Sequence, residues 1–261
     1  MGSQMVFKRY EIKYLMDRRQ RDAVLQAMEP YMSIDGYGHS SIRNIYYDTP
    51  SFRLIRESLE KPVYKEKLRV RSYGPAAAGD QVFVELKKKY RDVVYKRRIT
   101  LPQAQAEACM VRQASLPDSQ IGREIAYALE FYGDLAPAVF LSYEREAFFE
   151  KDGGDFRMTF DENIRYRQTE LTLDSHAWGK PLLQPDQVLM ELKTSGALPL
   201  WMVHALSRQG IFKTSFSKYG TAYRDILLCK SIAKYQDAPF SRPLRATEND
   251  AQNFMRSACC L

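Results

Sequence analysis

The most informative stretch of this sequence is Lys67-Leu-Arg-Val-Arg71, in which charged and apolar residues alternate. Successive side chains of a β-strand point to opposite faces of a sheet. The three basic residues would therefore lie on one face of a strand and the two apolar residues on the other. The stretch predicts a strand with one cationic face and one apolar face.

The same alternation recurs along the chain. It places charged side chains on one strand face at Arg9, Glu11 and Lys13, at Glu85 and Lys87, at Arg145, at Arg157 and Asp161, and at Glu191 and Lys193. A single half-exposed antiparallel strand also shows polar residues to water, so one such strand alone indicates little. Here the polar positions are mostly arginine, lysine and glutamate on several strands, which is unusual for a solvent face.

The repetition favours a sheet that closes on itself. In a closed barrel the charged faces would point inward and line a cationic tunnel. Like charges at close range repel each other unless an anion or paired carboxylates compensate them. Guanidinium groups carry a permanent charge in a planar fork that matches phosphate oxygens. These residues therefore predict a polyphosphate chain as the ligand.

Composition disfavours several common classes of protein. The chain has 261 residues and a formal net charge of +7, which favours an anionic partner. It contains no apolar run of the ~18–20 residues that span a bilayer, and its start is charged, so we expect neither a membrane-spanning nor a secreted protein. Four cysteines without C-x-x-C spacing predict neither a zinc site nor a disulfide framework, and the cytoplasm is the expected location. The sequence also lacks the phosphate-binding loop of common ATPases and a complete dinucleotide fingerprint.

Helical periodicity is confined to a few stretches. Apolar residues recur at helical spacing over Asp17–Tyr31, Pro102–Gln113, Ser119–Tyr132, Pro199–Ser207 and Ser217–Ile232. We expect one domain over residues 5–235, followed by a loosely held polar C-terminal tail over residues 236–261.

Several of these motifs, in this order and spacing, resemble one known family. They are Arg9-Tyr-Glu-Ile-Lys13, Asn44-Ile-Tyr-Tyr-Asp-Thr49, Phe52-Arg-Leu-Ile-Arg56, the pair Arg69 and Arg71, Val84-Glu-Leu-Lys87, Tyr143-Glu-Arg145 and Ser217-Lys-Tyr-Gly220. They resemble the VTC (vacuolar transporter chaperone) polyphosphate-polymerase domain, in its bacterial form. That domain belongs to the triphosphate tunnel metalloenzyme, or CYTH-like, superfamily. The resemblance extends from about Phe7 to Ile232.

The resemblance implies both a fold and an activity. The fold would be α+β, a closed eight-stranded antiparallel β-barrel with helices packed outside and a triphosphate in the lumen. The activity would be that of a metal-dependent polyphosphate polymerase, a polyphosphate kinase-type phosphotransferase that moves the γ-phosphoryl group of ATP to a growing polyphosphate. ATP, triphosphate, pyrophosphate and polyphosphate would be its ligands, and Mn²⁺ or Mg²⁺ its cofactor.

The resemblance also implies roles for individual residues. The phosphate ligands would be Lys13, Arg69, Arg71, Lys87, Arg145 and Arg157, with Arg56 and Lys193 as looser matches and either Lys96 or Arg97 as a further tunnel cation. Glu191 would hold the metal ion, with Glu11 and Glu85 as further carboxylates. Ser217 and Lys218 would lie beside the transferred phosphate as catalytic residues.

One departure from the superfamily pattern affects the choice of reaction. The wider superfamily begins with Glu-x-Glu-x-Lys, whose two carboxylates serve metal binding and water activation, but here the first position is Arg9. The loss of one carboxylate disfavours a two-metal hydrolase. Glu11 still leaves open a triphosphatase that cleaves inorganic triphosphate, a nucleoside triphosphate or an RNA 5′ end. A non-catalytic sensor of polyphosphate or inositol polyphosphates is the other alternative.

Partners follow from the same reasoning. We expect no nucleic-acid partner, because the tyrosines alternate with the charges across the strands instead of lying exposed beside outward basic stripes. Eukaryotic relatives work inside a membrane complex. The resemblance therefore implies a separately encoded membrane-protein partner that would hold this chain at the inner face of a membrane.

Overall fold

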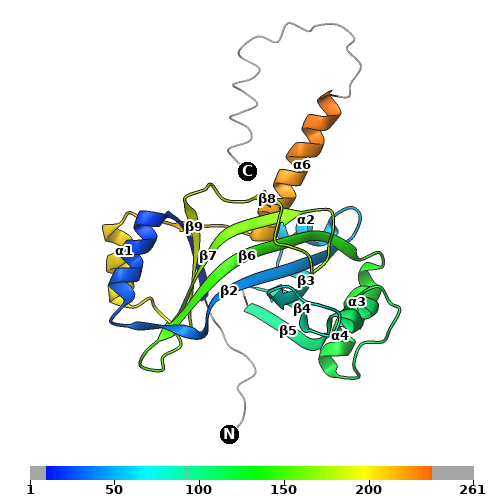
Figure 1. Ribbon diagram of the computed structural model, residues 1–261, viewed down its shortest axis with the longest axis horizontal. Coiled ribbons are helices and arrows are strands. Elements are labelled where there is room, and N and C mark those ends of the chain that lie inside the picture. Colours follow the sequence, from blue (N-terminus) through cyan, green and yellow to red (C-terminus); the bar gives the residue numbers. More distant parts are fainter. Residues whose placement is uncertain (1–9, 92, 237–261) are drawn as a thin grey trace, which may run out of the picture. The chain divides into compact units, whose positions relative to one another are not determined.

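The computed structural model describes residues 10–91 and 93–236, and its centre is one antiparallel sheet (Figure 1). The strands are β1 (Tyr10–Asp17), β2 (Met32–Asp48), β3 (Tyr64–Tyr73), β4 (Gln81–Tyr90), β5 (Val93–Pro102), β6 (Ala136–Glu150), β7 (Arg157–Arg167), β8 (Lys180–Pro181), β9 (Gln187–Thr194) and β10 (Lys213–Thr214). They follow the order β10-β1-β9-β7-β6-β2-β3-β4-β5, and β8 pairs with β7. The α+β class predicted from the sequence is confirmed.

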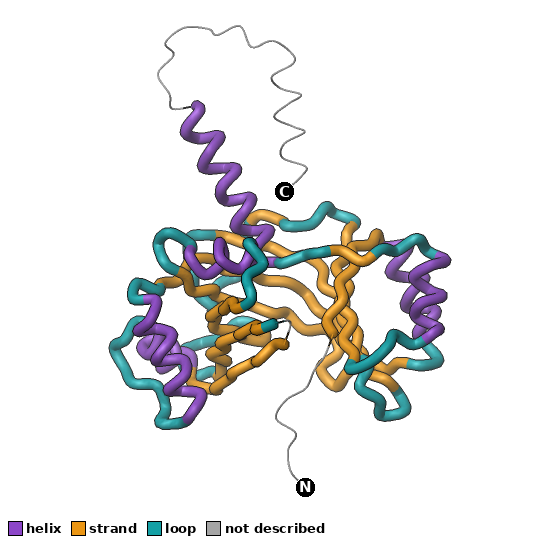
Figure 2. The backbone as a smooth tube through the Cα atoms, turned by 180° about the vertical axis from the view of Figure 1, so that it is seen from behind, coloured by secondary structure: helices purple, strands orange, loops and turns teal. Residues whose placement is uncertain are grey.

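The sheet is strongly curved but open, so the prediction of a closed eight-stranded barrel is wrong (Figure 2). Among the described strands, β5 and β10 lie at opposite ends of the sheet and do not pair. The two-residue β10 occupies the free edge of β1, and the chain that follows it passes next to β1 and β3. There, Lys13 Nζ of β1 donates to the carbonyl oxygen of Phe216 at 3.1 Å, and Lys67 Nζ of β3 donates to Ser217 Oγ at 3.2 Å. Phe216 and Ser217 therefore connect β1 with β3, which are not neighbours in the sheet.

Apolar residues at alternate strand positions form the convex face of the sheet, and two pairs of helices cover that face. Helices α1 (Arg18–Met28) and α5 (Leu200–Arg208) cover one end, where Val24 packs with Met158 and Met190. Helices α3 (Gln103–Met110) and α4 (Gln120–Tyr132) cover the other end, where Ile125 packs with Leu86. Because the apolar positions face these helices, the intervening charged positions face the concave side.

Local signals position the helices. Asp17 begins α1 with a capping box, in which its carboxylate accepts from the backbone N–H of Gln20 and the Gln20 side chain accepts from the Asp17 N–H. Ser119 caps α4 by accepting from the N–H of Gly122 at 3.0 Å. Helices are found in all five stretches where the periodicity predicted them.

A short helix, α2 (Arg53–Leu59), has no counterpart among the predicted helices. The carboxylate of Asp48, the last residue of β2, accepts from the backbone N–H groups of Leu54 and Ile55 at 2.9 and 3.1 Å. The hydroxyl of Tyr219 donates to the same carboxylate at 2.9 Å, and its ring stacks on Tyr46 with 4.5 Å between centroids. Asp48 thus starts α2 and fixes the first turn of α6 (Lys218–Gln236) against β2.

The chain divides into two compact units, one up to Tyr223 and one from Arg224 onward. The predicted boundary between a domain over residues 5–235 and a tail over residues 236–261 stays a prediction, because residues 237–261 lie outside the described part. Arg9 also lies outside it. No helix in the described ranges combines the length and the apolar character needed to cross a membrane.

Candidate functional site

Charged side chains from seven strands and from the start of α6 gather on the concave side of the sheet. We call the following set the concave charged face: Glu11, Lys13, Lys67, Arg69, Arg71, Glu85, Lys87, Lys96, Arg98, Arg145, Asp161, Glu191, Lys193 and Lys218. Cations outnumber carboxylates in this set. The face therefore attracts a polyanion.

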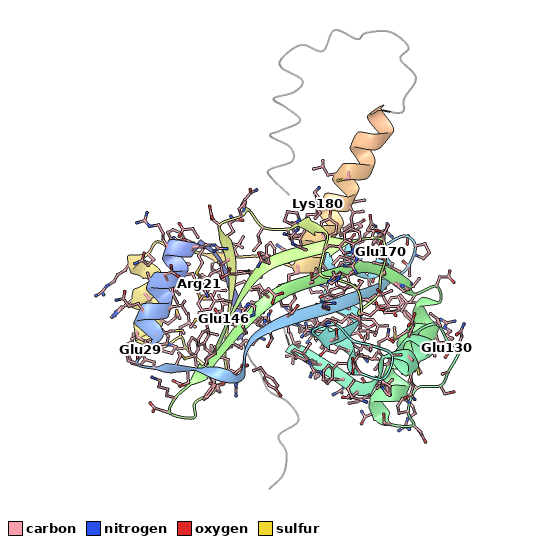
Figure 3. The ribbon with its side chains drawn as sticks, in the orientation of Figure 1. Arg21, Glu29, Glu130, Glu146, Glu170 and Lys180 are labelled. Atoms are coloured by element: carbon pink, nitrogen blue, oxygen red, sulfur yellow. The ribbon has the colours of Figure 1, made fainter. Side chains whose placement is uncertain are left out.

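The convex side has charged residues of its own, which pair locally. Arg21 of α1 forms ion pairs with Glu146 of β6 and with Glu162 of β7, the latter at 3.1 Å (Figure 3). Arg167 at the end of β7 donates to backbone carbonyls of the loop that follows, including that of Glu170 at 2.8 Å. These charges stabilise the convex side and lie apart from the concave charged face.

Glu85 is the centre of the first cluster on the concave charged face. Its side chain is 1% exposed and accepts from Arg69 Nε at 2.8 Å and from Arg98 Nε at 2.7 Å, and Lys96 Nζ lies 2.8 Å away. Burial alone would raise the pKa of Glu85, but the charges of Arg69, Arg71 and Lys96 outweigh it and hold the pKa far below its usual value. Burial lowers the pKa of Lys96 to about 8, although Glu85 opposes that shift. One carboxylate thus holds several cations close together.

Neutral groups orient the arginines of this cluster. Arg71 donates from Nε to Asn44 Oδ1 at 2.8 Å and from a terminal nitrogen to the Tyr143 hydroxyl at 3.1 Å. Arg69 donates to the Tyr46 hydroxyl at 3.0 Å. Guanidinium groups held in this way need little rearrangement to receive an anion.

Lys218 is the centre of the second cluster. Its Nζ lies 2.5 Å from Asp161 Oδ2 and 3.0 Å from Glu191 Oε1, and Arg145 donates twice to Asp161 at 2.6 Å. Burial would lower the pKa of Lys218, but Asp161 and Glu191 outweigh burial and raise the pKa above its usual value. Lys218 therefore remains a cation in a buried position.

A third group joins the two ends of the open sheet through side chains. Lys13 Nζ lies 3.3 Å from Glu11 Oε1 and 3.4 Å from Glu191 Oε1, and Lys87 Nζ of β4 lies 3.7 Å from Glu11 Oε2 of β1. Burial raises the pKa of Glu11, but the charge of Lys87, with a contribution from Lys13, outweighs it, and the pKa falls to about 2. Glu11 is therefore ionised at neutral pH.

Lys67 differs from the other cations of the face in its surroundings. Burial, followed by the charges of Lys87 and Lys13, lowers its pKa to about 7. Its Nζ donates to the hydroxyl of Ser217, which also accepts from the N–H of Gly220 in the first turn of α6. Lys67 is thus a lysine that can lose its proton near neutral pH beside the two residues predicted to flank the transferred phosphate.

The structure separates some of the sequence-predicted residues from this face. Lys96 lies on it, whereas Arg97 points to the convex side and donates to Glu124 of α4 at 3.0 Å. Arg56 is exposed on α2. Arg157 has the right parity but is exposed beside Lys193, near the far end of β2 from Arg71.

The structure also adds residues that the sequence reasoning did not single out as site residues. Asp161, Arg98 and Lys67 lie on the concave charged face. Each one is two positions from a predicted neighbour or in the same alternating run, so strand parity alone could have identified them. Tyr143, two positions from Arg145, carries the same signal, whereas no strand parity with a predicted site residue marks Asn44.

Whether the concave charged face can hold a metal ion depends on how its carboxylates are arranged. Within the described ranges, no group of three or more His, Cys, Asp or Glu side chains has metal-binding geometry. Glu11 and Glu191 do share Lys13, so their oxygens lie within reach of a common small cation. Mg²⁺ and similar ions commonly take one or two carboxylates and complete their coordination with phosphate oxygens and water. These residues therefore fit a metal ion that arrives with a phosphate ligand.

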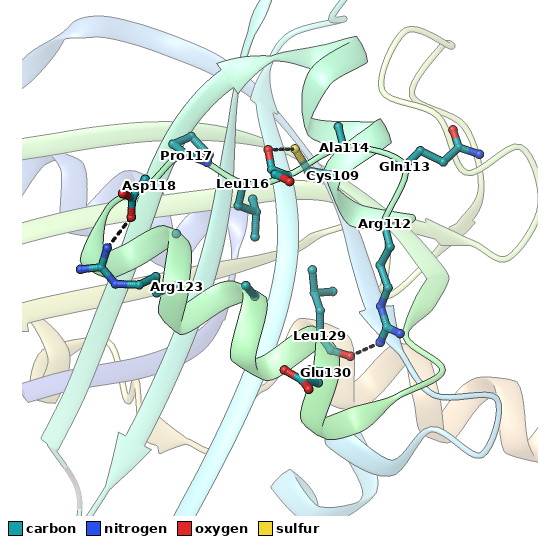
Figure 4. A pocket seen from close by; sticks show the side chains of 13 residues that line it. Cys109, Arg112, Gln113, Ala114, Leu116, Pro117, Asp118, Arg123, Leu129 and Glu130 are labelled. Carbon is teal, nitrogen blue, oxygen red and sulfur yellow. Dashed lines mark hydrogen bonds and ion pairs between the residues drawn. The ribbon is translucent and has the colours of Figure 1, made fainter.

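A pocket of about 650 Å³ lies elsewhere, between α3 and α4 (Figure 4). Cys109 at its wall donates to the Ser115 carbonyl at 3.3 Å, and Arg112 donates to the Leu129 carbonyl at the end of α4. Its lining residues belong to the convex side, so it has no part in the concave charged face.

Three solved structures are similar to this chain at low sequence identity. A "putative adenylate cyclase" from Bacillus halodurans has a TM-score of 0.50 and 16% identity, over 83% of this chain and 96% of that chain. A protein of the same description from Vibrio parahaemolyticus gives 0.44 and 14%, over 84% and 99%. A protein from Pyrococcus horikoshii gives 0.39 and 14%, over 85% and 99%. No curated protein matches the sequence.

The curved antiparallel sheet with a charged concave face and helices on its convex side places the chain in the same class of fold as the first of these structures. Within that class, the family model of the VTC domain matches residues 8–227. The chain belongs to the VTC domain family.

Proposed function

We propose that the concave charged face binds the triphosphate of ATP and that the protein transfers the γ-phosphoryl group to a polyphosphate chain. The observation that supports this most is the excess of cations over carboxylates on one partly buried face, in a chain of the VTC domain family. Such a face is unfavourable by itself and is compensated by a polyanion.

Phosphoryl transfer requires the protein mainly to position the reacting phosphates and to supply positive charge. In phosphoryl transfer a terminal oxygen of the acceptor attacks the γ-phosphorus, the bond to the oxygen that bridges to the β-phosphate breaks, and ADP leaves with the electron pair. Charge spreads over the equatorial oxygens in the transition state. Cations already fixed by neutral and acidic neighbours stabilise this charge without reorganising, and Lys218 and Arg145 are held in this way.

We assign the phosphate contacts to Lys13, Arg69, Arg71, Lys87, Lys96, Arg145 and Lys193, and the transferred phosphoryl group to Ser217 and Lys218. Glu191, with Glu11, would hold Mg²⁺ or Mn²⁺. The bound ion would supply positive charge against the phosphate oxygens.

Hydrolysis of a triphosphate is the second candidate, and Glu11 bears on it. A general base for water works best with a pKa near the operating pH. The pKa of Glu11 is lowered to about 2 because Lys87 and Lys13 outweigh its burial. Glu11 is therefore a weak base for water, which favours transfer to a phosphate acceptor over hydrolysis.

The test is a product analysis. The protein is incubated with labelled ATP and Mg²⁺ or Mn²⁺, and the products are separated as polyphosphate or orthophosphate. Polyphosphate supports the proposal, orthophosphate alone indicates a triphosphatase, and binding of triphosphate without any product indicates a sensor.

A variant tests the role of Glu191. Glu191→Gln keeps the size of the side chain and removes the charge that a divalent ion needs. Metal-dependent turnover should fall by about a hundredfold or more, while metal-free binding of triphosphate is retained or tightened. The matched control is Glu124→Gln, which removes a carboxylate that accepts from Lys88 and Arg97 on the convex side. Near-normal turnover of Glu191→Gln would show that Glu191 is only an ion-pair partner.

A further inference from the structure

Three aromatic rings lie next to one end of the concave charged face. The rings of Tyr37 and Tyr73 stack with 6.4 Å between centroids and 15° between planes, and Tyr73 packs edge-on against Phe83 at 5.7 Å. Tyr37 is 84% exposed and Tyr73 is 51% exposed. We call these three residues the aromatic platform.

The aromatic platform is continuous with the arginine cluster. Tyr73 and Phe83 share the strand parity of Arg71 and Glu85, so they lie on the same face of the sheet. The guanidinium of Arg98 lies 4.3 Å from the centroid of Phe83, and its Nε donates to Glu85 at 2.7 Å. Arg98 therefore connects a stacking surface with a phosphate-type anion site.

A role in folding does not account for Tyr37. A ring that is 84% exposed buries little apolar surface, so it contributes little to stability. Its segment is irregular: the β2–β6 register shifts between Ile34 and His39, and Gly38 has a φ of +56°. The backbone N–H of Tyr37 donates to Asp35 Oδ1 at 3.0 Å, which holds the turn that presents the ring.

We propose that the aromatic platform binds the base of the nucleoside triphosphate whose phosphates occupy the concave charged face. This inference rests on the proposed function and deepens it by assigning the nucleoside to one end of the face. Flat rings beside an arginine bind bases by stacking, and this contact tolerates any base because every base has a π-face.

The spacing of residues along β3 indicates how the ligand is oriented on the concave charged face. Lys67, which contacts Ser217, and Tyr73 lie on the same strand with the same parity, about 20 Å apart at ~3.3 Å per residue. Arg69 and Arg71 lie between them on that face. A nucleoside triphosphate therefore has its base at Tyr73 and its phosphates along Arg71 and Arg69 toward Ser217, with the nucleoside at the end of β3 away from Ser217.

The experiment compares two probes on the same variants. Binding of ATP and of inorganic tripolyphosphate is measured by calorimetry for the full chain, for Tyr37→Ala and for Tyr37→Trp. Tyr37→Ala should weaken ATP binding by about tenfold and leave tripolyphosphate binding unchanged, since one base stack is lost. Tyr37→Trp should retain ATP binding. The matched control is Tyr127→Ala, which removes a ring that is 65% exposed and stacked on Phe131 of α4.

The outcomes separate this inference from the proposed function. If the unmodified chain binds neither probe, the proposed function is wrong. If it binds tripolyphosphate but Tyr37→Ala leaves ATP binding unchanged, or weakens both probes equally, the base site is wrong and the proposed function stands. A loss confined to ATP that Tyr37→Trp does not show supports the base site.

Discussion

Removing the charge of Glu85 should destabilise the protein, and a bound polyanion should restore part of the lost stability. Glu85 is 1% exposed and contacts Arg69, Arg98 and Lys96 within 2.8 Å, so Glu85→Gln leaves these cations facing one another. Breaking a buried ion pair costs ~3–5 kcal/mol. Because the side chains of Lys96 and Arg98 keep 46% and 31% of their exposure, water solvates them in part, and we take about 3 kcal/mol as the cost. At ~2–4 °C per kcal/mol for a chain of this size, the melting temperature should fall by about 6–12 °C.

The assay is thermal unfolding with and without tripolyphosphate. In Glu85→Gln the anion replaces the missing negative charge, so its stabilising effect should be larger than in the unmodified chain. Glu124→Gln is the matched control, since Glu124 also accepts from a lysine and an arginine but lies on the convex side. This control should cost at most about 1 kcal/mol and show no additional recovery. Equal loss in both variants, or equal recovery, would refute the argument that Glu85 holds the cation cluster together.

Two further predictions concern lysines of the concave charged face. Burial and the charges of Lys87 and Lys13 lower the pKa of Lys67 to about 7, so between pH 7 and about 10 Lys67 binds fewer protons in the folded than in the unfolded chain. The free energy of unfolding should therefore rise with pH in that window. The affinity for tripolyphosphate should fall as the pH rises through 7, because Lys67 loses its charge. Denaturation and binding series over pH 6–10 should show both slopes reduced in Lys67→Met, and unchanged slopes would contradict the assignment. Lys96→Ala should weaken tripolyphosphate binding by several-fold, because Lys96 faces the concave side, whereas Arg97→Ala should leave binding unaltered, because Arg97 pairs with Glu124. Equal effects of these two substitutions in a direct binding assay would mean that strand parity does not determine which cation meets the ligand.

Strand parity was the part of the site that the sequence could predict. The alternation in Lys67–Arg71 and in Val82–Lys87 placed charges on one face and apolar residues on the other, and the structure shows both faces as predicted. Parity also places Lys96 and Arg97 on opposite faces of β5. Which of the two faces the concave side depends on the pairing register of β5 with β4, and the sequence does not show that register. That choice required the cross-strand pairing of Glu85 with Arg98 and of Lys87 with Lys96.

The alternation of charged and apolar residues could not show whether the sheet closes. The charged faces showed which side is concave, but whether two edges meet depends on what lies between them. Here the segment at Phe216 and Ser217 contacts Lys13 of β1 and Lys67 of β3, and these long-range contacts leave no pattern within a single strand. Helix α2 was missed for a different reason, since the Asp48 carboxylate begins it by accepting from the N–H groups of Leu54 and Ile55, and apolar periodicity does not mark it.

The open sheet leaves β5 as an edge strand, and this has a consequence for association between copies of the chain. A long edge strand presents unpaired backbone groups that invite another strand to add to it, which is a common start of aggregation. The run Lys96-Arg97-Arg98 places positive charge on both faces of this edge. A second copy that offered the same strand would meet like charges, so Lys96 and Arg98 of the concave charged face and their neighbour Arg97 also discourage edge-to-edge pairing.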